Sequence, residues 1–345
     1  MPNATIEASA PGKLVLSGEY AVLAGAPAIV AAVDRRVVCR IAEASSGGWS
    51  FESSGFEGKS RHSLAALLAG EVQADDPGAI VAHALSYLAR GGDFAGGTYF
   101  DRGTRFDRRA LPEHLSVEID SSQCFHEARK LGVGSSAGTV VAFCSALAAH
   151  TSQSVELPDL LRIHRASQGG SGSGLDVAAA FHGGVIRCQD GLAQPVTLPE
   201  TLNYLFVYAG FSTATNEMLE RFDAWRAGGN TGVLDKLVDA AWRTADACHA
   251  DGNFLDALND YITALVKLDD AAKIGILPAV QRSAQGIAEE VGVLYKPCGA
   301  GGGDTGVAVG RDPAKLREFG NRITTIGFTM LPLEIAKDGV KVSDR

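Results

Sequence analysis

KLGVGSSAGTVVAFCSALAAH, residues 130–150, places glycines and serines directly ahead of a largely apolar run. Glycine lets backbone amides approach a ligand closely, and successive amides at the start of a helix bind anions. A helix over 139–149 would also direct the positive end of its dipole toward the loop. Three interpretations follow: a phosphate-binding loop, a dinucleotide-binding fingerprint, or a tight turn in which Ser135 or Ser136 only caps a buried helix.

Neither familiar nucleotide motif accounts for this loop. The letters GVGSSA satisfy the dinucleotide pattern G-x-G-x-x-G/A, and Glu156 lies about where a ribose-binding acid is found. That fingerprint requires a strand that runs straight into the loop, whereas the strand expected at LSVEID ends at Asp120, well before Gly132. The P-loop pattern GxxxxGK[ST] does not occur in the sequence. The phosphate-binding interpretation therefore needs support from the rest of the chain.

Composition limits the classes of protein that are possible. The chain has 345 residues, which predicts two domains, because one hydrophobic core seldom extends over that length. A formal net charge of −9 argues against nucleic-acid binding and against an anionic membrane surface, so an anionic substrate would be held by local cations. Six scattered cysteines without a CxxC pair, and a start without an apolar signal segment, indicate a cytoplasmic protein with reduced thiols.

Strands and helices in mixed order predict an α+β protein, not one doubly wound sheet. Residues 5–25 indicate a strand, a Pro-Gly turn and a second short strand, and RRVVCRIAEA and LSVEID indicate further strands. The loop-like segment QDGLAQPVTLP marks a boundary, so we expect domains over 1–192 and 193–345. The second domain would hold a strand at LNYLFVYAG, long helices over 215–291 and an edge strand at GFTMLPLEI.

Three glycine-rich segments occur along the chain: APGKLVLSGEYAVL (residues 10–23), LGVGSSAG (131–138) and GAGGGDTGVAV (299–309). In this order they resemble the three motifs of the GHMP kinase superfamily, whose members transfer the γ-phosphoryl group of ATP to small molecules. The resemblance spans nearly the whole chain. It implies an α+β fold with an N-terminal α/β domain, a C-terminal ferredoxin-like α+β domain, and ATP with Mg²⁺ in the cleft between them.

The resemblance also implies which residues form the site. Lys13, Lys130 and Asp176 would be catalytic, and Ser136 would bind the metal. The ATP-binding residues would be Lys130, Gly132, Gly134, Ser135, Ser136 and Ala137. The small-molecule acceptor would be bound by Lys13, Glu19, Tyr20, Ser173, Gly174, Asp176, Ser212, Gly301, Gly302 and Asp304.

Details of the motifs favour the phosphomevalonate kinase branch of the superfamily. GSGSGLDVAAAFHGG (170–184) resembles the signature of that branch, as do Lys130 before the second motif and Asp304 in the third. Such an enzyme would join two phosphorylated ligands, so it would need several cations, and Arg187 and Lys296 are further candidates. The alternatives are a mevalonate kinase, with an alcohol as acceptor, and a non-catalytic protein of the same fold that binds ATP and a metabolite.

Several points stay open at the level of sequence. Mevalonate kinases carry a metal-binding glutamate about eleven residues before the catalytic aspartate, and Arg165 occupies that position here. Asp176 either acts in the site or caps a short helix, and both roles are compatible. We expect the adenine pocket to use loops between about residues 60 and 110, and the protein to be a monomer or a homodimer.

Overall fold

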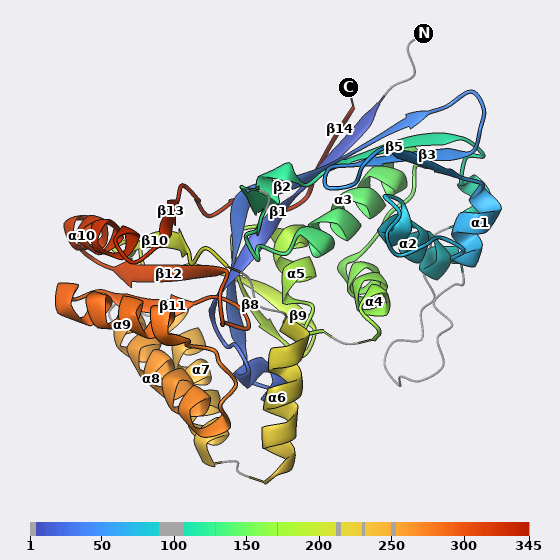
Figure 1. The fold of residues 1–345 in the computed structure, drawn as a ribbon. Coiled ribbons are helices and arrows are strands. Elements are labelled where there is room, and N and C mark those ends of the chain that lie inside the picture. Colours follow the sequence, from blue (N-terminus) through green and yellow to red (C-terminus); the bar gives the residue numbers. More distant parts are fainter. Residues whose placement is uncertain are drawn as a thin grey trace.

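The computed structural model describes residues 5–89, 107–127, 129–170, 172–211, 215–229, 232–249 and 253–344. These residues form two main sheets with helices packed against each, as Figure 1 shows, and a small two-stranded sheet. An α+β architecture is therefore confirmed. In the described part of the chain, no helix is long and apolar enough to cross a membrane.

The larger sheet belongs mainly to the first half of the chain. Its strands are β1 (Ile6–Ser17), β2 (Ala28–Glu43), β3 (Trp49–Ser53), β4 (Lys59–His62), β5 (Leu115–Asp120), β8 (Val185–Gln189), β9 (Leu192–Val196) and β14 (Lys341–Asp344). The order is β14-β1-β2-β5-β3-β4, and β8 pairs with both β2 and β9. The long strand β2 joins these parts, because it pairs with β8 at one end and β5 at the other.

Helix α3 (Ser135–His150) packs on β1 and β2 and forms the centre of the first core. Residues 137–148 are buried, which explains the nearly continuous apolar run after the glycine loop. Against it lie α2 (Ala79–Ala89), α4 (Leu157–Ser167) and α5 (Leu175–His182), and α1 (Leu64–Ala69) packs on α2, as Figure 1 shows. Because α3 starts at Ser135 and not at 139, its first turn reaches into the glycine loop.

The smaller sheet is antiparallel, with the order β11-β12-β10-β13. Its strands are β10 (Asn203–Tyr208), β11 (Leu294–Pro297), β12 (Thr305–Gly310) and β13 (Thr329–Leu331). Helices α9 (Ala279–Val291) and α10 (Pro313–Thr324) cover one face with a separate apolar cluster. The chain between the sheets forms α6 (Thr215–Ala227), α7 (Gly232–Asp246) and α8 (Phe254–Ala272). The predicted edge strand and the helical 215–291 region are confirmed.

Short elements complete the described chain: the two-stranded pair β6 (Phe125–His126) and β7 (Arg129–Lys130), and the 3-10 turns η1 (Ala21–Ala24), η2 (Arg108–Ala110), η3 (Ser122–Cys124) and η4 (Ala247–His249). The pair β6–β7 directly precedes the glycine loop. It therefore marks the point where the chain turns from the first sheet toward α3.

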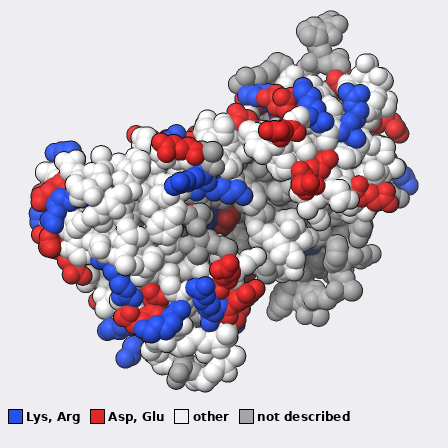
Figure 2. Space-filling view, in the orientation of Figure 1, with Lys and Arg blue, Asp and Glu red and all other residues white. Residues whose placement is uncertain are grey.

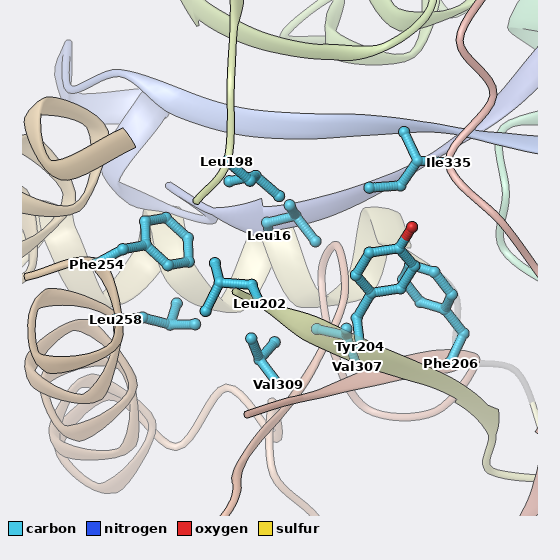
Figure 3. A pocket seen from close by; sticks show the side chains of 10 residues that line it. All are labelled: Leu16, Leu198, Leu202, Tyr204, Phe206, Phe254, Leu258, Val307, Val309 and Ile335. Carbon is cyan, nitrogen blue, oxygen red and sulfur yellow. The ribbon is translucent and has the colours of Figure 1, made fainter. Parts of the chain in front are cut away.

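Apolar side chains join the two halves. Figure 3 shows a pocket between them to which β1 contributes Leu16, α8 contributes Phe254 and Leu258, and the smaller sheet contributes residues of β10 and β12. These side chains come from segments that are far apart in the sequence. The face of the smaller sheet that α9 and α10 leave uncovered is thus packed against the first domain.

Two details differ from the expectations. Residues 6–17 form one strand with a register shift between Pro11 and Gly12, not two strands separated by a turn, because β2 pairs with both parts. The expected boundary at 192/193 cuts through the β8–β9 hairpin, and the chain changes sheet between Val196 and Asn203. Strand β14 also returns to pair with β1, so the last residues belong to the first sheet.

Candidate active site

The first and second glycine motifs meet at the open edge of β1. The Lys13 amide donates a hydrogen bond to the Val133 carbonyl oxygen at 2.8 Å. This edge is free because β14 pairs with β1 only over Ile6–Ser9. A Cβ on Gly12 would lie 2.8 Å from the same carbonyl oxygen, closer than real Cβ atoms come. Gly12 therefore allows the loop to lie directly on the strand.

The loop ends at Gly134, which is the N-cap of α3 with φ 80° and ψ 41°. The interpretation in which Ser135 or Ser136 is the cap is therefore wrong: both lie inside the first turn. The first backbone amides of a helix have no partner within it, so those of Ser135, Ser136 and Ala137 are available to a ligand. Ser136 is exposed, whereas the helix beyond it is buried. The geometry is that of an anion-binding helix start.

A charged pair lies against this loop. The Lys13 ammonium is 3.4 Å from Asp176 Oδ1, with side-chain exposures of 12% and 32%. A Cβ on Gly134 would lie 3.2 Å from Asp176 Oδ2 and 3.5 Å from Lys13 Cγ, so the pair and the loop are in contact. Helix α5 is capped by Gly174, and Asp176 lies in its first turn. Gly174, and not Asp176, is therefore the N-cap of α5, and the Asp176 carboxylate contacts Lys13.

The third motif closes the other side of the loop. A Cβ on Gly132 would lie 2.9 Å from Asp304, and Thr305 Oγ1 donates a hydrogen bond to the Leu131 carbonyl oxygen at 2.7 Å. Gly301 and Gly302 are buried, and the Gly302 amide bonds to the Ile276 carbonyl oxygen at 2.8 Å. Segments about 170 residues apart are therefore adjacent.

The support for the third motif comes from Asp269, a residue that sequence reasoning missed. Its carboxylate accepts hydrogen bonds from the amides of Gly275, Ile276 and Leu277 at 2.7–2.9 Å. Arg282 forms an ion pair with the same carboxylate. Because Ile276 in turn contacts Gly301 and Gly302, Asp269 holds the third motif in place from behind. Nothing in the sequence around Asp269 distinguishes it from a surface acid at a helix end.

Glu19 and Tyr20 occupy the junction between the first and third motifs. Glu19 is 5% exposed, and its carboxylate forms an ion pair with Lys296 and accepts a hydrogen bond from the Tyr261 hydroxyl at 2.7 Å. Burial raises the pKa of Tyr261 well above its ordinary value, so this hydroxyl remains a donor. The Tyr20 hydroxyl donates to the Ala300 carbonyl oxygen at 2.7 Å. Both side chains, which were expected at the acceptor, are buried and bond to protein groups.

Among the cations considered from sequence, Lys13 and Lys130 border the loop. Lys130 is exposed at the end of β7. Lys296 differs from the expectation, because its side chain is 1% exposed and its ammonium contacts Glu19 and the Val15 carbonyl oxygen. Arg187 forms an ion pair with Asp246 and lies over the Trp242 ring, so its guanidinium group is also engaged by other protein groups.

Figure 2 shows one face of the molecule, on which basic and acidic side chains are interspersed and a hollow lies between the two domains. Attraction of an anionic ligand therefore depends on the few cations at the hollow, as the net charge suggested.

Helix α4 contributes two residues near the loop. Arg165 donates from Nε to the Gly172 carbonyl oxygen at 3.2 Å, so it supports the segment that leads to Asp176. His164 is 4% exposed, and its Nε2 lies 3.1 Å from Ser136 Oγ. Burial lowers the pKa of His164, and the nearby Lys13 acts in the same direction, while Asp176 opposes them. His164 showed no ligand pattern in the sequence.

The expected Mg²⁺ fits the kind of donors found here. The described residues hold no group of three or more His, Cys, Asp or Glu side chains that could hold a metal alone. Mg²⁺ in kinases is usually bound by one or two protein oxygens together with phosphates and water. Ser136, an exposed residue in the first turn of α3, suits that role.

Some expected residues lie elsewhere or outside the described part. Ser173 is exposed, and with Gly174 it lines a pocket that extends to the β8–β9 hairpin. Ser212 and much of the expected adenine region, residues 90–106, lie outside the described residues. The segments that do meet are the first motif, the glycine loop, the start of α5 and the third motif.

Comparison with known proteins finds sequences similar to this chain. Residues 104–184, which include the glycine loop and Asp176, match the family model of the GHMP kinases N terminal domain. The chain is 28% identical to a phosphomevalonate kinase from Streptomyces sp. (strain CL190), over 97% of this chain and 98% of that protein. It is 23% identical to a mevalonate kinase from Pyrococcus horikoshii, over 98% and 97%.

Solved structures show the same fold over nearly the full length. A Streptococcus pneumoniae phosphomevalonate kinase in complex with phosphomevalonate and AMPPNP has a TM-score of 0.75 at 19% identity, and 95% of this chain and 99% of that chain are covered. A mevalonate kinase structure has a TM-score of 0.72 at 16% identity, with 96% and 99% covered. The two-domain GHMP kinase fold is thereby confirmed.

Proposed function

We propose that this protein transfers the γ-phosphoryl group of ATP to the phosphate of 5-phosphomevalonate, giving 5-diphosphomevalonate in the mevalonate route to isoprenoids. The observation that carries the proposal is the contact of the Lys13–Asp176 pair with Gly134 of the glycine loop. The similarity to the Streptomyces phosphomevalonate kinase over nearly both whole chains supports the choice of acceptor.

Each segment of the site has a role in such a transfer. Phosphoryl transfer depends mainly on positioning and on neutralising charge. The amides at the start of α3 would bind the phosphates of ATP, and Ser136 would bind Mg²⁺, which neutralises phosphate charge when present. Lys13 would lie between donor and acceptor and stabilise the charge on the transferred group. Asp304 and the third motif would limit the space for the acceptor.

The acceptor is tested by measuring ADP release with 5-phosphomevalonate and with mevalonate as alternative substrates. We expect kcat/KM to be higher for 5-phosphomevalonate by at least about 10³-fold, because a site built for a charged group rejects the analogue that lacks it. Turnover with mevalonate alone would assign the chain to the alcohol-phosphorylating enzymes. Nucleotide binding without ADP release for either acceptor would favour the non-catalytic alternative.

Asp176 distinguishes the two kinds of acceptor by mechanism. An alcohol must lose a proton during transfer, so a general base contributes about 10²–10⁴-fold, whereas a phosphate dianion has no proton to lose. We therefore expect Asp176→Asn, which keeps the shape but not the charge, to lower kcat by only about 10-fold, through weaker positioning of Lys13. Steady-state kinetics with 5-phosphomevalonate measure this, and a loss beyond about 10³-fold would show that Asp176 acts as a base.

A further inference from the structure

His164 lies behind the glycine loop and is almost fully buried. It is 4% exposed, and its neighbours on the same helix, Leu160 and Ile163, belong to the apolar core. A buried imidazole is costly unless its nitrogen atoms are hydrogen-bonded. Its Nε2 lies 3.1 Å from Ser136 Oγ and 3.3 Å from Gln168 Nε2. The ring thus contacts the loop through the serine hydroxyl.

The chemistry of these two neighbours sets the direction of the hydrogen bonds. The Gln168 amide is oriented with its NH₂ group toward His164, and an NH₂ group donates and does not accept, so in this orientation Nε2 of His164 is the acceptor. An Nε2 that accepts carries no proton, and the Ser136 hydroxyl must then donate to it. The single proton of that hydroxyl is therefore directed toward α4, and its oxygen lone pairs are not used in this hydrogen bond.

We propose that His164 is a positioning residue, which orients the Ser136 hydroxyl so that its lone pairs can bind the metal ion of a metal–nucleotide complex. The proposal rests on the proposed function only in assuming that ATP and a divalent ion are bound at this loop. It does not depend on which acceptor is phosphorylated. Partners that orient a metal ligand typically change metal affinity by about 10–100-fold when they are removed.

The test uses two variants of His164 whose side chains differ in length. The amide oxygen of glutamine extends to about the position of Nε2 and can accept the Ser136 proton, whereas asparagine is polar but too short. Binding of Mn²⁺ to the full-length protein in the presence of ADP is measured by electron paramagnetic resonance, together with binding of metal-free ADP in EDTA. Both measurements are made without an acceptor, so a wrong assignment of the acceptor would leave their results unchanged.

We expect His164→Asn to weaken Mn²⁺ binding by about 10-fold and His164→Gln to remain within about 3-fold of the wild type. Affinity for metal-free ADP should change by less than about 2-fold in both, since the loop amides are untouched. Equal losses for metal-bound and metal-free ADP, or equal losses in the two variants, would show a merely structural role and overturn the proposal.

A double-mutant cycle with Ser136→Ala gives an independent check. If His164 acts through Ser136, His164→Asn should have no further effect on Mn²⁺ affinity once the hydroxyl is gone. Additive losses in the double variant would mean that His164 acts by another route, and the proposal would be withdrawn. Thermal unfolding of all variants shows whether the protein remains folded at the assay temperature.

Discussion

Replacing Lys13 with methionine is expected to lower kcat by about 10²–10³-fold, the usual cost of removing one group that stabilises charge in the transition state. Lys13 is the cation that contacts the loop and Asp176 together, and its ammonium is mostly shielded from water. Methionine keeps the length of the side chain, so packing on β1 should be retained. The measurement is kcat for ADP release at saturating ATP and acceptor.

The control for this variant is Lys236→Met, which removes an exposed lysine on α7 and should leave kcat unchanged. Equal unfolding temperatures for the two variants would exclude a general loss of structure. A Lys13→Met enzyme with nearly full activity would contradict the role of Lys13. Arginine at this position should restore little, because its planar fork does not reproduce the compact ammonium.

The largest effect on stability is expected at Lys296. This lysine is 1% exposed and forms an ion pair with Glu19 across the two domains. Lys296→Met would leave the Glu19 carboxylate buried without its cation, which typically costs about 3–5 kcal/mol of unfolding free energy. Urea unfolding followed by circular dichroism measures the change. A surface pair provides the matched control: Lys59→Met removes the exposed partner of Glu52 and should barely move the midpoint.

A second substitution tests the cause of that loss. Glu19→Gln removes the unpaired charge, and the Tyr261 hydroxyl can still donate to the amide oxygen of the new side chain. The double variant, Glu19→Gln with Lys296→Met, should therefore recover about 2 kcal/mol or more of the loss caused by Lys296→Met alone. If the double variant were no more stable than Lys296→Met, the loss would come from packing and not from the buried charge.

Part of the site could be predicted because its requirements are local. The glycines of the loop and of the third motif have positive φ at Gly132, Gly134, Gly299, Gly301 and Gly302, a conformation that other residues adopt at a cost. Such positions can therefore be recognised in the sequence by their glycines. The apolar run after the loop likewise predicted a helix, although the start of α3 at Ser135 depended on Gly134 as its cap.

Other parts could not be predicted, because they depend on contacts between distant segments. Asp269 and His164 look like a helix-end acid and a surface histidine in the sequence, yet the fold places them behind the third motif and the glycine loop. Pro11 and Gly12 suggested a turn, but pairing with β2 keeps residues 6–17 in one strand. At this position the hydrogen bonds between β1 and β2 outweigh the local preference of Pro-Gly for a turn.

The sequence by itself determined the order of the three motifs, the two-domain α+β class and the residues around the glycine loop, because each needs particular residues at neighbouring positions. Only the tertiary structure decided which charges remain available to a ligand. Lys13 and Lys296 are both lysines near glycine motifs, but Lys296 is enclosed by Glu19, which lies 277 residues away in the chain. Burial and pairing of a charge are properties of the folded chain, so no local pattern could separate the two.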